Sequence, residues 1–375
     1  MEVAKLQYIL LRNIQLGVSK LQNSFLKKIK TGGQGDNMAT LKDIAKIAGV
    51  NKSTVSRALN DGIGISEDKR NEILKIADEL GYIPNENAKV LAGKKAKTIG
   101  IIIPEIDCNY YASLVGTIEK KLKRQGYSLI IGQTGFKFEN EMHYLKLFIQ
   151  KNVDGIIFDL YNSDKFLAEF EAVKNFLSIP VVYIECSLNT PDYDVIEADN
   201  NYGVDLAIEH LVSLGHKRIG FISEYLSSKV RMPLYFDALK KYGIAVDKKI
   251  VKVGSERLEE GGYLRMNELL SESRPPTAVF ASYDTMAQGA LKAISEHGLK
   301  VPEDISIVGF DNIRESAYFS VPLTTVAPPV IDMGEIAVST LLHKIEKKER
   351  SLVQYISLKP RIIVRNSTAN VKICG

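Results

Sequence analysis

From Thr98 onward, short apolar runs alternate with amphipathic stretches, and this alternation limits the possible fold more than any other feature. The nine apolar runs are TIGIIIP, SLIIG, GIIFDL, VVYIE, VIEAD, RIGFIS, IVKVG, AVFAS and ISIVGFD. β-Branched apolar strands separated by helices are typical of a parallel sheet that is covered on both faces. Because nine strands exceed the usual number in one sheet, the pattern predicts two doubly wound lobes. Ligands of such folds bind at the carboxyl ends of the strands, so we expect a ligand cleft between the lobes.

Residues 40–81 carry a different pattern, that of three short helices. Thr40 is expected to cap the first helix, and Gly49 to end it. Asn51 is expected to cap the second helix. Ser66 would open the third, whose apolar residues fall on one face. A helix, a tight turn at a glycine and a second helix have the geometry of a helix-turn-helix motif.

The second of these helices lies in the segment GVNKSTVSRALN, which is dense in Lys, Ser, Thr and Arg. At helical spacing, Lys52, Ser53 and Ser56 share the outer face, whereas Val55 and Leu59 point inward. Hydroxyls and cations suit the phosphates and base edges of DNA, and the inward pair would dock the helix on its neighbours. A solvated surface helix has a similar composition, so this segment alone leaves both readings open.

The formal net charge of +4 does not indicate a nucleic-acid partner. Residues 1–37 contain six basic and two acidic residues, so the remaining 43 basic and 43 acidic residues of the chain cancel. The segment GGQGDNM at the end of this leader looks like a translated purine-rich ribosome-binding site. We therefore expect Met38 to be the native start, the alternative being that residues 1–37 form a frayed amphipathic arm.

The sequence carries no signal for export, membrane insertion, metal binding or catalysis. Its apolar runs are shorter than the roughly 18 residues that span a membrane, and charges interrupt its N-terminal stretch. Three widely spaced cysteines favour reduced thiols in a cytoplasmic protein. The chain has no phosphate-binding loop motif, no HExxH motif and no histidine cluster. We therefore expect no metal, no cofactor and no enzymatic activity.

Several motifs taken together resemble those of the LacI/GalR family of bacterial transcription repressors. In chain order they are TLKDIAKIAGVNKSTVSRALN, ISEDKRNEILKIADELGYIPN, AKVLAG, TIGIIIP, IEHLVSLGHKRIGFI, PTAVFASYDTMAQGAL, VPEDISIVGFDN and PLTTV. The resemblance runs from about Thr40 to Arg365. It implies an all-α helix-turn-helix DNA-binding domain, a hinge helix, and a dimerising α/β core like that of periplasmic binding proteins, with two doubly wound parallel-sheet lobes.

The pattern and the resemblance together predict the domain boundaries. The expected segments are a leader at 1–37, a DNA-binding domain at 38–84, a hinge helix and linker at 85–97, and an effector-binding and dimerisation core at 98–375. The expected lobes are lobe 1 at about 98–196 plus 326–350, and lobe 2 at about 199–325 plus 351–368.

The resemblance implies that the segment NKSTVSRALN holds the recognition helix, which contacts double-stranded operator DNA with pseudo-palindromic symmetry. Lys52 and Ser53 occupy the positions that most often select bases in the family, and a lysine favours the acceptors of guanine. The positions that hold phosphates and the register of the helix are Thr54, Ser56, Arg57 and Asn60. In the hinge helix, Ala88 and Leu91 would contact DNA, Leu91 as an apolar wedge that kinks the minor groove.

The resemblance also implies an effector site between the lobes. Arg231 and Asp311 match a cation and a carboxylate that bond sugar hydroxyls, the alternative being a surface ion pair. The other expected effector residues are Tyr110, Tyr111, Glu185, Tyr283 and Phe319. Two departures from the family's pattern are Tyr283 in place of an Asn and Leu234 in place of a Gly. They indicate a larger sugar, a sugar acid or a non-sugar effector.

The sequence therefore predicts a dimeric, sequence-specific transcription regulator, a repressor whose operator affinity is controlled by a small sugar or sugar derivative. Two other functions are compatible with the same core. A freestanding sugar-binding transport protein would need an export signal and would lack the helix-turn-helix motif, which is the reverse of this sequence. An enzyme that acts on sugars would need catalytic motifs, and those named above are missing.

Overall fold

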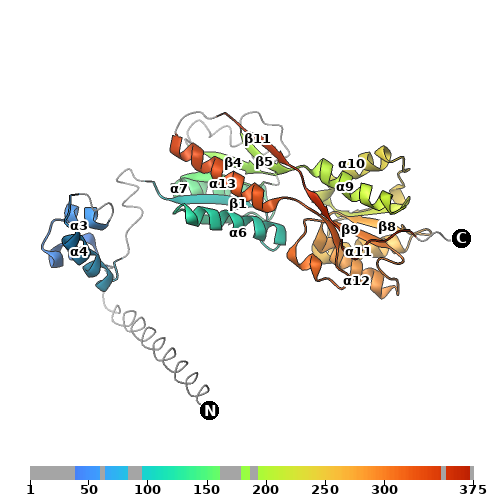
Figure 1. The fold of residues 1–375 in the computed structure, drawn as a ribbon, viewed down its shortest axis with the longest axis horizontal. Helices are drawn as coiled ribbons and strands as arrows, with labels where there is room; N and C mark the ends of the chain where they lie inside the picture. The colour runs from blue at the N-terminus through green and yellow to red at the C-terminus, as the bar shows by residue number, and fades with distance from the viewer. Residues whose placement is uncertain are drawn as a thin grey trace, which may run out of the picture. The chain divides into compact units, whose positions relative to one another are not determined.

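A computed structural model describes most of the chain, in two compact units that comprise Met1–Ala88 and Lys89–Gly375 (Figure 1). The described residues are 39–59, 64–82, 95–160, 179–185, 193–347 and 352–371. The expected leader, the expected DNA contact Asn60, and the expected hinge residues Ala88 and Leu91 lie outside them.

The first unit contains three short helices, α2 (Leu41–Ala48), α3 (Lys52–Leu59) and α4 (Glu67–Glu79), as the sequence predicts. Helix α2 begins at Thr40, whose backbone N–H and hydroxyl donate to Asp43 at 2.8 and 2.7 Å. These bonds also hold the pKa of Asp43 below its usual range. Helix α2 ends at Gly49, whose φ of 64° is a left-handed conformation that glycine adopts without strain.

A small apolar core joins the three helices. Ile44, Val55, Ala58 and Ile73 are fully buried in it, so each helix contributes at least one of these side chains. Basic side chains of α4 secure the ends of the other two helices. The Lys69 ammonium donates to the carbonyl of Ala48 at 2.8 Å, and the Arg70 Nε donates to that of Ala58 at 3.3 Å. A cation at a helix C-terminus satisfies its free carbonyls and complements its dipole.

The second unit is built on two six-stranded sheets, one in each lobe. In spatial order, the sheet of the first lobe contains β11 (Tyr355–Leu358), β5 (Asp194–Ala198), β4 (Val181–Ile184), β3 (Gly155–Phe158), β1 (Thr98–Ile103) and β2 (Ser128–Gln133). All of its strand pairs are parallel. Helices α6 (Asn109–Arg124) and α13 (Val330–Lys347) cover one face, and α7 (Phe138–Gln150) covers the other.

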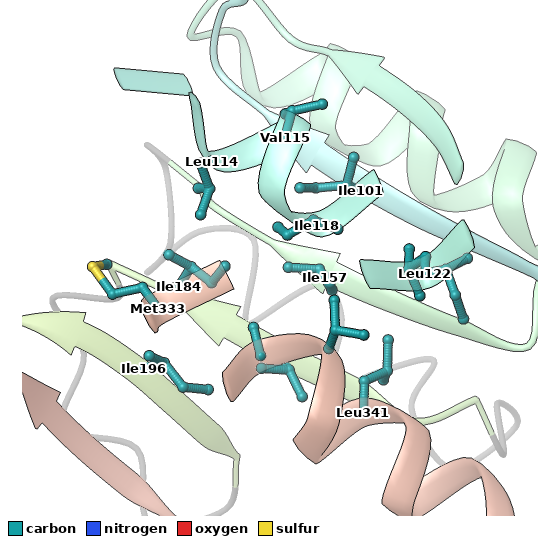
Figure 2. Packing of buried hydrophobic residues seen from close by; sticks show 14 of the residues in the cluster. Ile101, Leu114, Val115, Ile118, Leu122, Ile157, Ile184, Ile196, Met333 and Leu341 are labelled. Atoms are coloured by element: carbon teal, nitrogen blue, oxygen red, sulfur yellow. The ribbon is translucent and has the colours of Figure 1, made fainter. Parts of the chain in front are cut away.

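Figure 2 shows the larger of the two apolar layers of this lobe. Side chains from four neighbouring strands meet side chains from α6 and α13 there; the labelled ones include Ile101, Ile157, Ile184, Ile196, Leu114, Ile118, Met333 and Leu341. All eight are completely buried. Burial of one such side chain contributes about 1.5–3 kcal/mol, so this layer fixes α6 against the carboxyl ends of the strands.

The second lobe repeats the plan. Its sheet contains β12 (Arg361–Ile363), β10 (Thr324–Ala327), β9 (Ser306–Phe310), β8 (Ala278–Ala281), β6 (Ile219–Glu224) and β7 (Val251–Gly254). Only β12 is antiparallel to its neighbour. Helices α9 (Asn200–Ser213) and α10 (Tyr225–Lys241) cover one face, and α11 (Leu258–Leu270) and α12 (Asp284–Glu296) cover the other. Two short 3-10 helices, η1 (Lys248–Ile250) and η2 (Arg314–Ala317), lie in its connections. Every described helix of the chain is too short or too polar to span a membrane.

Two glycines let α11 and α12 touch backbone to backbone. A Cβ on Gly262 would lie 1.8 Å from the carbonyl oxygen of Met286, and one on Gly289 would lie 1.8 Å from that of Glu259. No side chain fits in such a space, so only glycine allows this approach. The close pairing fixes the first turns of both helices, which adjoin the cleft.

All nine predicted strands are confirmed, but the predicted boundaries between the lobes differ from the structure in two places, and the second of these is a wrong assignment. Residues 326–350 were expected in lobe 1, and α13 at 330–347 does pack on the first sheet, although β10 of the second lobe extends two residues past the expected boundary, to Ala327. Residues 351–368 were expected in lobe 2, yet β11 pairs with β5 of the first lobe. Buried Asp194 explains the second difference, because its Oδ1 accepts from the Gln354 backbone N–H at 2.8 Å and its carboxylate pairs with Lys344. The chain therefore returns to the first sheet before it ends in the second.

His216 anchors the C-terminal segment to the second lobe. Its side chain is only 3% exposed. Nε2 lies 3.1 Å from the carbonyl of Ala369 and must donate to it, so Nδ1 accepts from the Thr277 hydroxyl at 3.0 Å. Ser306 adds a third contact at 3.1 Å. Burial lowers the pKa of His216, because the imidazolium form would lose solvation.

We expect His216 to make the core less stable in acid. The folded state binds fewer protons at this site than the unfolded state, so stability is complete above about pH 6.5 and falls as the pH decreases. At pH 7.5, His216→Ala should cost about 1–3 kcal/mol, since it leaves buried hydrogen-bonding groups unsatisfied. Urea unfolding followed by circular dichroism from pH 7.5 to 5.5 measures both effects.

His343→Ala is the matched control, because His343 is exposed on α13. It should leave the unfolding midpoint unchanged. If wild type and His216→Ala lose stability equally as the pH falls, another group causes the acid sensitivity.

Candidate nucleic-acid interface and effector cleft

Helix α3 presents a polar surface at its exposed face. Lys52, Ser53 and Arg57 are exposed, whereas Thr54 and Ser56 are half-buried. The prediction for the inner face is confirmed for Val55, which is fully buried; Leu59 is half-buried against the same core, and Ala58 is the second fully buried residue. The exposed side chains are two cations and a hydroxyl, with no acidic residue in the helix.

Exposed donors also gather at the N-terminus of α3, where Lys52 and Ser53 form its first turn. Free backbone N–H groups and the positive end of the helix dipole favour an anion there. This end of the helix can therefore hold a phosphate while the exposed side chains reach toward bases.

In the core, two carboxylates stand at the carboxyl ends of strands in a strained backbone. Glu185 directly follows β4 with φ of 51°, and Asp311 directly follows β9 with φ of 105°. Residues other than glycine avoid this region, and strain of this kind is found mostly at functional sites. One carboxylate comes from each lobe, as the resemblance implies.

Arg231 on α10 lies beside Asp311. Its Nη2 is 3.5 Å from the Asp311 carboxylate, its Nη1 donates to the carbonyl of Ser282, and its guanidinium lies 3.8 Å from the ring centroid of Phe310. Burial raises the pKa of Asp311 to about 6, although Arg231 stabilises its charged form. The pair is largely buried, so it is not the surface ion pair that the sequence left open.

Tyr110 and Tyr111 lie in the first turn of α6, with their rings edge to face at 5.2 Å. Burial raises the pKa of both hydroxyls well above the usual range, and the carboxylates of Asp159 and Glu185 raise both further. Among the described residues, the Tyr110 hydroxyl has no hydrogen-bond partner. An unsatisfied buried hydroxyl is costly, so a ligand group is a natural partner for it.

Asp159 is a cleft residue that the sequence analysis did not identify. It follows β3, is only 5% exposed, and its Oδ2 has no hydrogen-bond partner within the described parts of the chain. Burial raises its pKa well above the usual range, and the negative charge of Glu185 adds to this. The signal in the sequence was a single acid directly after a fully apolar strand, in GIIFDL.

The structure brings five of the seven expected effector residues together. Burial raises the pKa of Glu185 to about 7, although bonds from the Ala198 backbone and the charge of Arg231 in the other lobe stabilise its charged form. The charge of Asp311 likewise raises the pKa of Tyr110 across the cleft. Arg231 and Asp311 of the second lobe therefore act on Glu185 and Tyr110 of the first, and Tyr111 lies beside Tyr110.

The other two expected residues have different surroundings. The Tyr283 hydroxyl accepts from the backbone N–H of Leu258 at 2.9 Å, and its ring packs in the core of the second lobe. Phe319 is also mostly buried there and lines a neighbouring pocket of about 730 Å³. That pocket lies between the lobes, since Asp107 and Asn109 contribute to its wall.

Polar contacts join the lobes at the edge of the cleft. Arg257 of the second lobe donates two hydrogen bonds, of 2.7 and 2.8 Å, to the Glu105 carboxylate of the first. The same guanidinium lies 4.2 Å from the ring centroid of Phe136. Asn109 donates to Glu315 at 2.9 Å. A bidentate pair of this kind fixes orientation as well as distance, so it holds the lobes in one relative position.

The arrangement can bind a small polar ligand through directional hydrogen bonds in a water-poor site. Within the described residues, no group of three or more His, Cys, Asp or Glu side chains could hold a metal ion. Among the described residues, the charged and phenolic groups of the cleft are the carboxylates of Asp159, Glu185 and Asp311, the Arg231 guanidinium and the hydroxyls of Tyr110 and Tyr111.

Comparison with known proteins identifies both units. Residues 40–85 match the family model of bacterial regulatory proteins, lacI family, and residues 208–368 match that of the periplasmic binding protein-like domain. The HTH-type transcriptional repressor PurR of Pasteurella multocida is 35% identical over 337 residues, which cover 88% of this chain and 98% of that protein.

Two solved structures agree with this. The lac repressor dimer bound to operator and the anti-inducer ONPF is 28% identical, with a TM-score of 0.79, and the match covers 89% of this chain and all of that one. A LacI family regulator from Enterococcus faecium with bound ribose is 30% identical, with a TM-score of 0.65, and the match covers 73% of this chain and all of that one.

The matched regions include the helix-turn-helix unit and the two-lobed core, and the relatives are repressors and not enzymes. This chain belongs to the LacI family of bacterial regulatory proteins and is a ligand-controlled transcriptional repressor.

Proposed function

We propose that this repressor acts in the cytoplasm as a dimer and binds a pseudo-palindromic operator. A small polyhydroxylated effector that binds in the cleft controls whether the repressor stays on the operator or leaves it. The lac repressor is a dimer on its operator, and a LacI family regulator from Enterococcus faecium binds ribose. Two-fold symmetry in the protein calls for matching symmetry in the operator, because each subunit contributes one recognition helix.

For the DNA contacts, we propose that Lys52 and Ser53 select bases while Thr54, Ser56, Arg57 and Asn60 hold the backbone. The exposure of Lys52, Ser53 and Arg57 on α3 supports this assignment. We assign residues 85–97 to the hinge, with Ala88 and Leu91 contacting the minor groove.

For the effector, the observation that carries the proposal is the convergence of Arg231 and Asp311 from one lobe with Tyr110, Tyr111 and Glu185 from the other. Charged groups fixed at the ends of strands give strong, directional bonds to hydroxyls, and tyrosine rings can lie against a sugar face. Tyr283 and Phe319 would support the wall behind them, because both pack into the core of the second lobe.

Ligand binding can be coupled to DNA binding through the lobes. A ligand that contacts both lobes favours one relative orientation of them over others. Because the hinge joins the DNA-binding unit to the start of the first lobe, lobe orientation can alter how the two hinges of a dimer pair. A coupling free energy of about 1–3 kcal/mol is typical of such systems and gives a switch of several-fold or more.

Lys52→Ala should change which base is preferred at one position of each half-site, at a cost of roughly 1–3 kcal/mol on the best operator. Binding to a library with that position randomised measures this. Lys75→Ala, an exposed lysine on α4, is the control and should leave preference and affinity unchanged. An equal loss of affinity for every sequence would make Lys52 a phosphate contact only.

Arg231→Ala and Asp311→Asn should each lower effector affinity by roughly 10–100-fold, the cost of losing a charged hydrogen bond. The operator affinity without effector should stay the same. Thermal-shift screening of sugars identifies a ligand, and fluorescence anisotropy with labelled operator measures the response. Arg274→Ala, which alters an exposed arginine of the same lobe, is the control. A full response at the wild-type ligand concentration in either cleft variant would show that the ligand binds elsewhere.

A further inference from the structure

The first lobe brings two carboxylates side by side at one edge of its sheet. Strands β3 and β4 are paired in parallel, with Phe158 opposite Tyr183. Asp159 directly follows β3, and Glu185 follows β4. In this register Asp159 lies opposite Ile184, and Glu185 follows one residue further along the neighbouring strand, where its positive φ breaks the regular alternation of side chains; both acids leave the sheet at its carboxyl edge. The effect of the Glu185 charge on the pKa of Asp159 agrees with this closeness.

Neither carboxylate forms an ion pair with any described residue. Glu185 accepts from the Ala198 backbone N–H at 3.0 Å and from the Asn200 side chain at 3.3 Å, which are both neutral donors. Oδ2 of Asp159 has no partner within the described residues, although the side chain is 95% buried. The cleft's cations are engaged elsewhere: Arg231 with Asp311 and the Ser282 carbonyl, and Arg257 with Glu105.

A buried acid pair without a cation in contact is unfavourable. Burial favours the protonated forms, which reduces this cost: it raises the pKa of Glu185 to about 7 and that of Asp159 well above its usual range. A ligand cation would supply the missing charge. The charges of both acids raise the pKa of the Tyr110 and Tyr111 hydroxyls, and aromatic faces such as those of these two rings attract ammonium groups. A carboxylate or phosphate on the ligand would find no positive partner in the acid pair.

We propose that the effector carries an amino group, which binds as an ammonium between Asp159 and Glu185. The inference rests on the proposed polyhydroxylated effector: its hydroxyls meet Arg231 and Asp311 of the second lobe, and its ammonium meets the acid pair of the first. The ligand class is therefore an amino sugar or a similar amino polyol. Anionic sugar derivatives do not belong to this ligand class.

A matched panel tests this directly with the full-length protein. The probes are aldohexoses and aldopentoses, each as its neutral, amino-deoxy, N-acetylamino and uronate form, and isothermal calorimetry gives each Kd at pH 7.5. At least one amino form should bind roughly tenfold or more tightly than its neutral parent, and N-acetylation should remove the gain. A neutral or uronate form that binds as tightly as its amino counterpart would overturn the inference and leave the proposed function standing. If no compound binds, the polyhydroxylated effector itself is wrong, and the inference fails with it.

Two variants then locate the ammonium. Asp159→Asn and Glu185→Gln keep the shape of each side chain and should each lower the ratio of amino-form to neutral-form affinity by roughly 10–100-fold. Circular dichroism confirms that each variant is folded. Asp237→Asn makes the same charge change at an exposed position on α10 and should leave the ratio unchanged. If both cleft variants keep the wild-type ratio, the acid pair does not bind the amino group.

Discussion

The cleft is organised by buried carboxylates that the protein neutralises only in part. Parallel strands deliver Asp159, Glu185 and Asp311 to the facing edges of two sheets, and two of these residues are held at positive φ. Asp311 has a cation beside it in Arg231, whereas the two acids of the first lobe have only neutral donors or none. Burying such groups costs free energy that the apolar layers of both lobes must offset, and a ligand that completes the pairing recovers part of it.

Because the ligand-binding groups come from both lobes, ligand binding is connected to the movement of one lobe against the other. The chain passes from one lobe to the other between Ala198 and Asn200, between Ala327 and Val330, and between Leu358 and Arg361. Such short crossings allow rotation of one lobe against the other while each apolar core stays intact. The Arg257–Glu105 pair at the rim favours one orientation, and a ligand inside the cleft adds its own preference to that pair.

Strong patterns made most of the fold predictable from sequence, and the misses have physical reasons. The nine apolar strands and the capped helix α2 were foreseeable, because continuous apolar runs and a Thr40–Asp43 box are local signals. Strand β10 begins with two threonines, β12 has only three residues, and β11 alternates between half-buried and exposed residues as an edge strand does, so hydrophobicity did not mark them. Arg231 and Asp311 came from a family resemblance. Asp159 had only a weak signal, an acid directly after an apolar strand, and its importance depends on a buried oxygen without a partner among the described residues.

Coupling between the cleft and the DNA-binding unit is the central claim, and thermodynamic reciprocity tests it most directly. The operator affinity is measured with and without saturating effector, and the effector affinity is measured with and without saturating operator. Coupling requires that the operator affinity and the effector affinity change by the same factor, which is roughly 5–150-fold in typical allosteric proteins. An effector that binds the cleft of the free protein and the cleft of the operator complex with equal affinity would contradict the account.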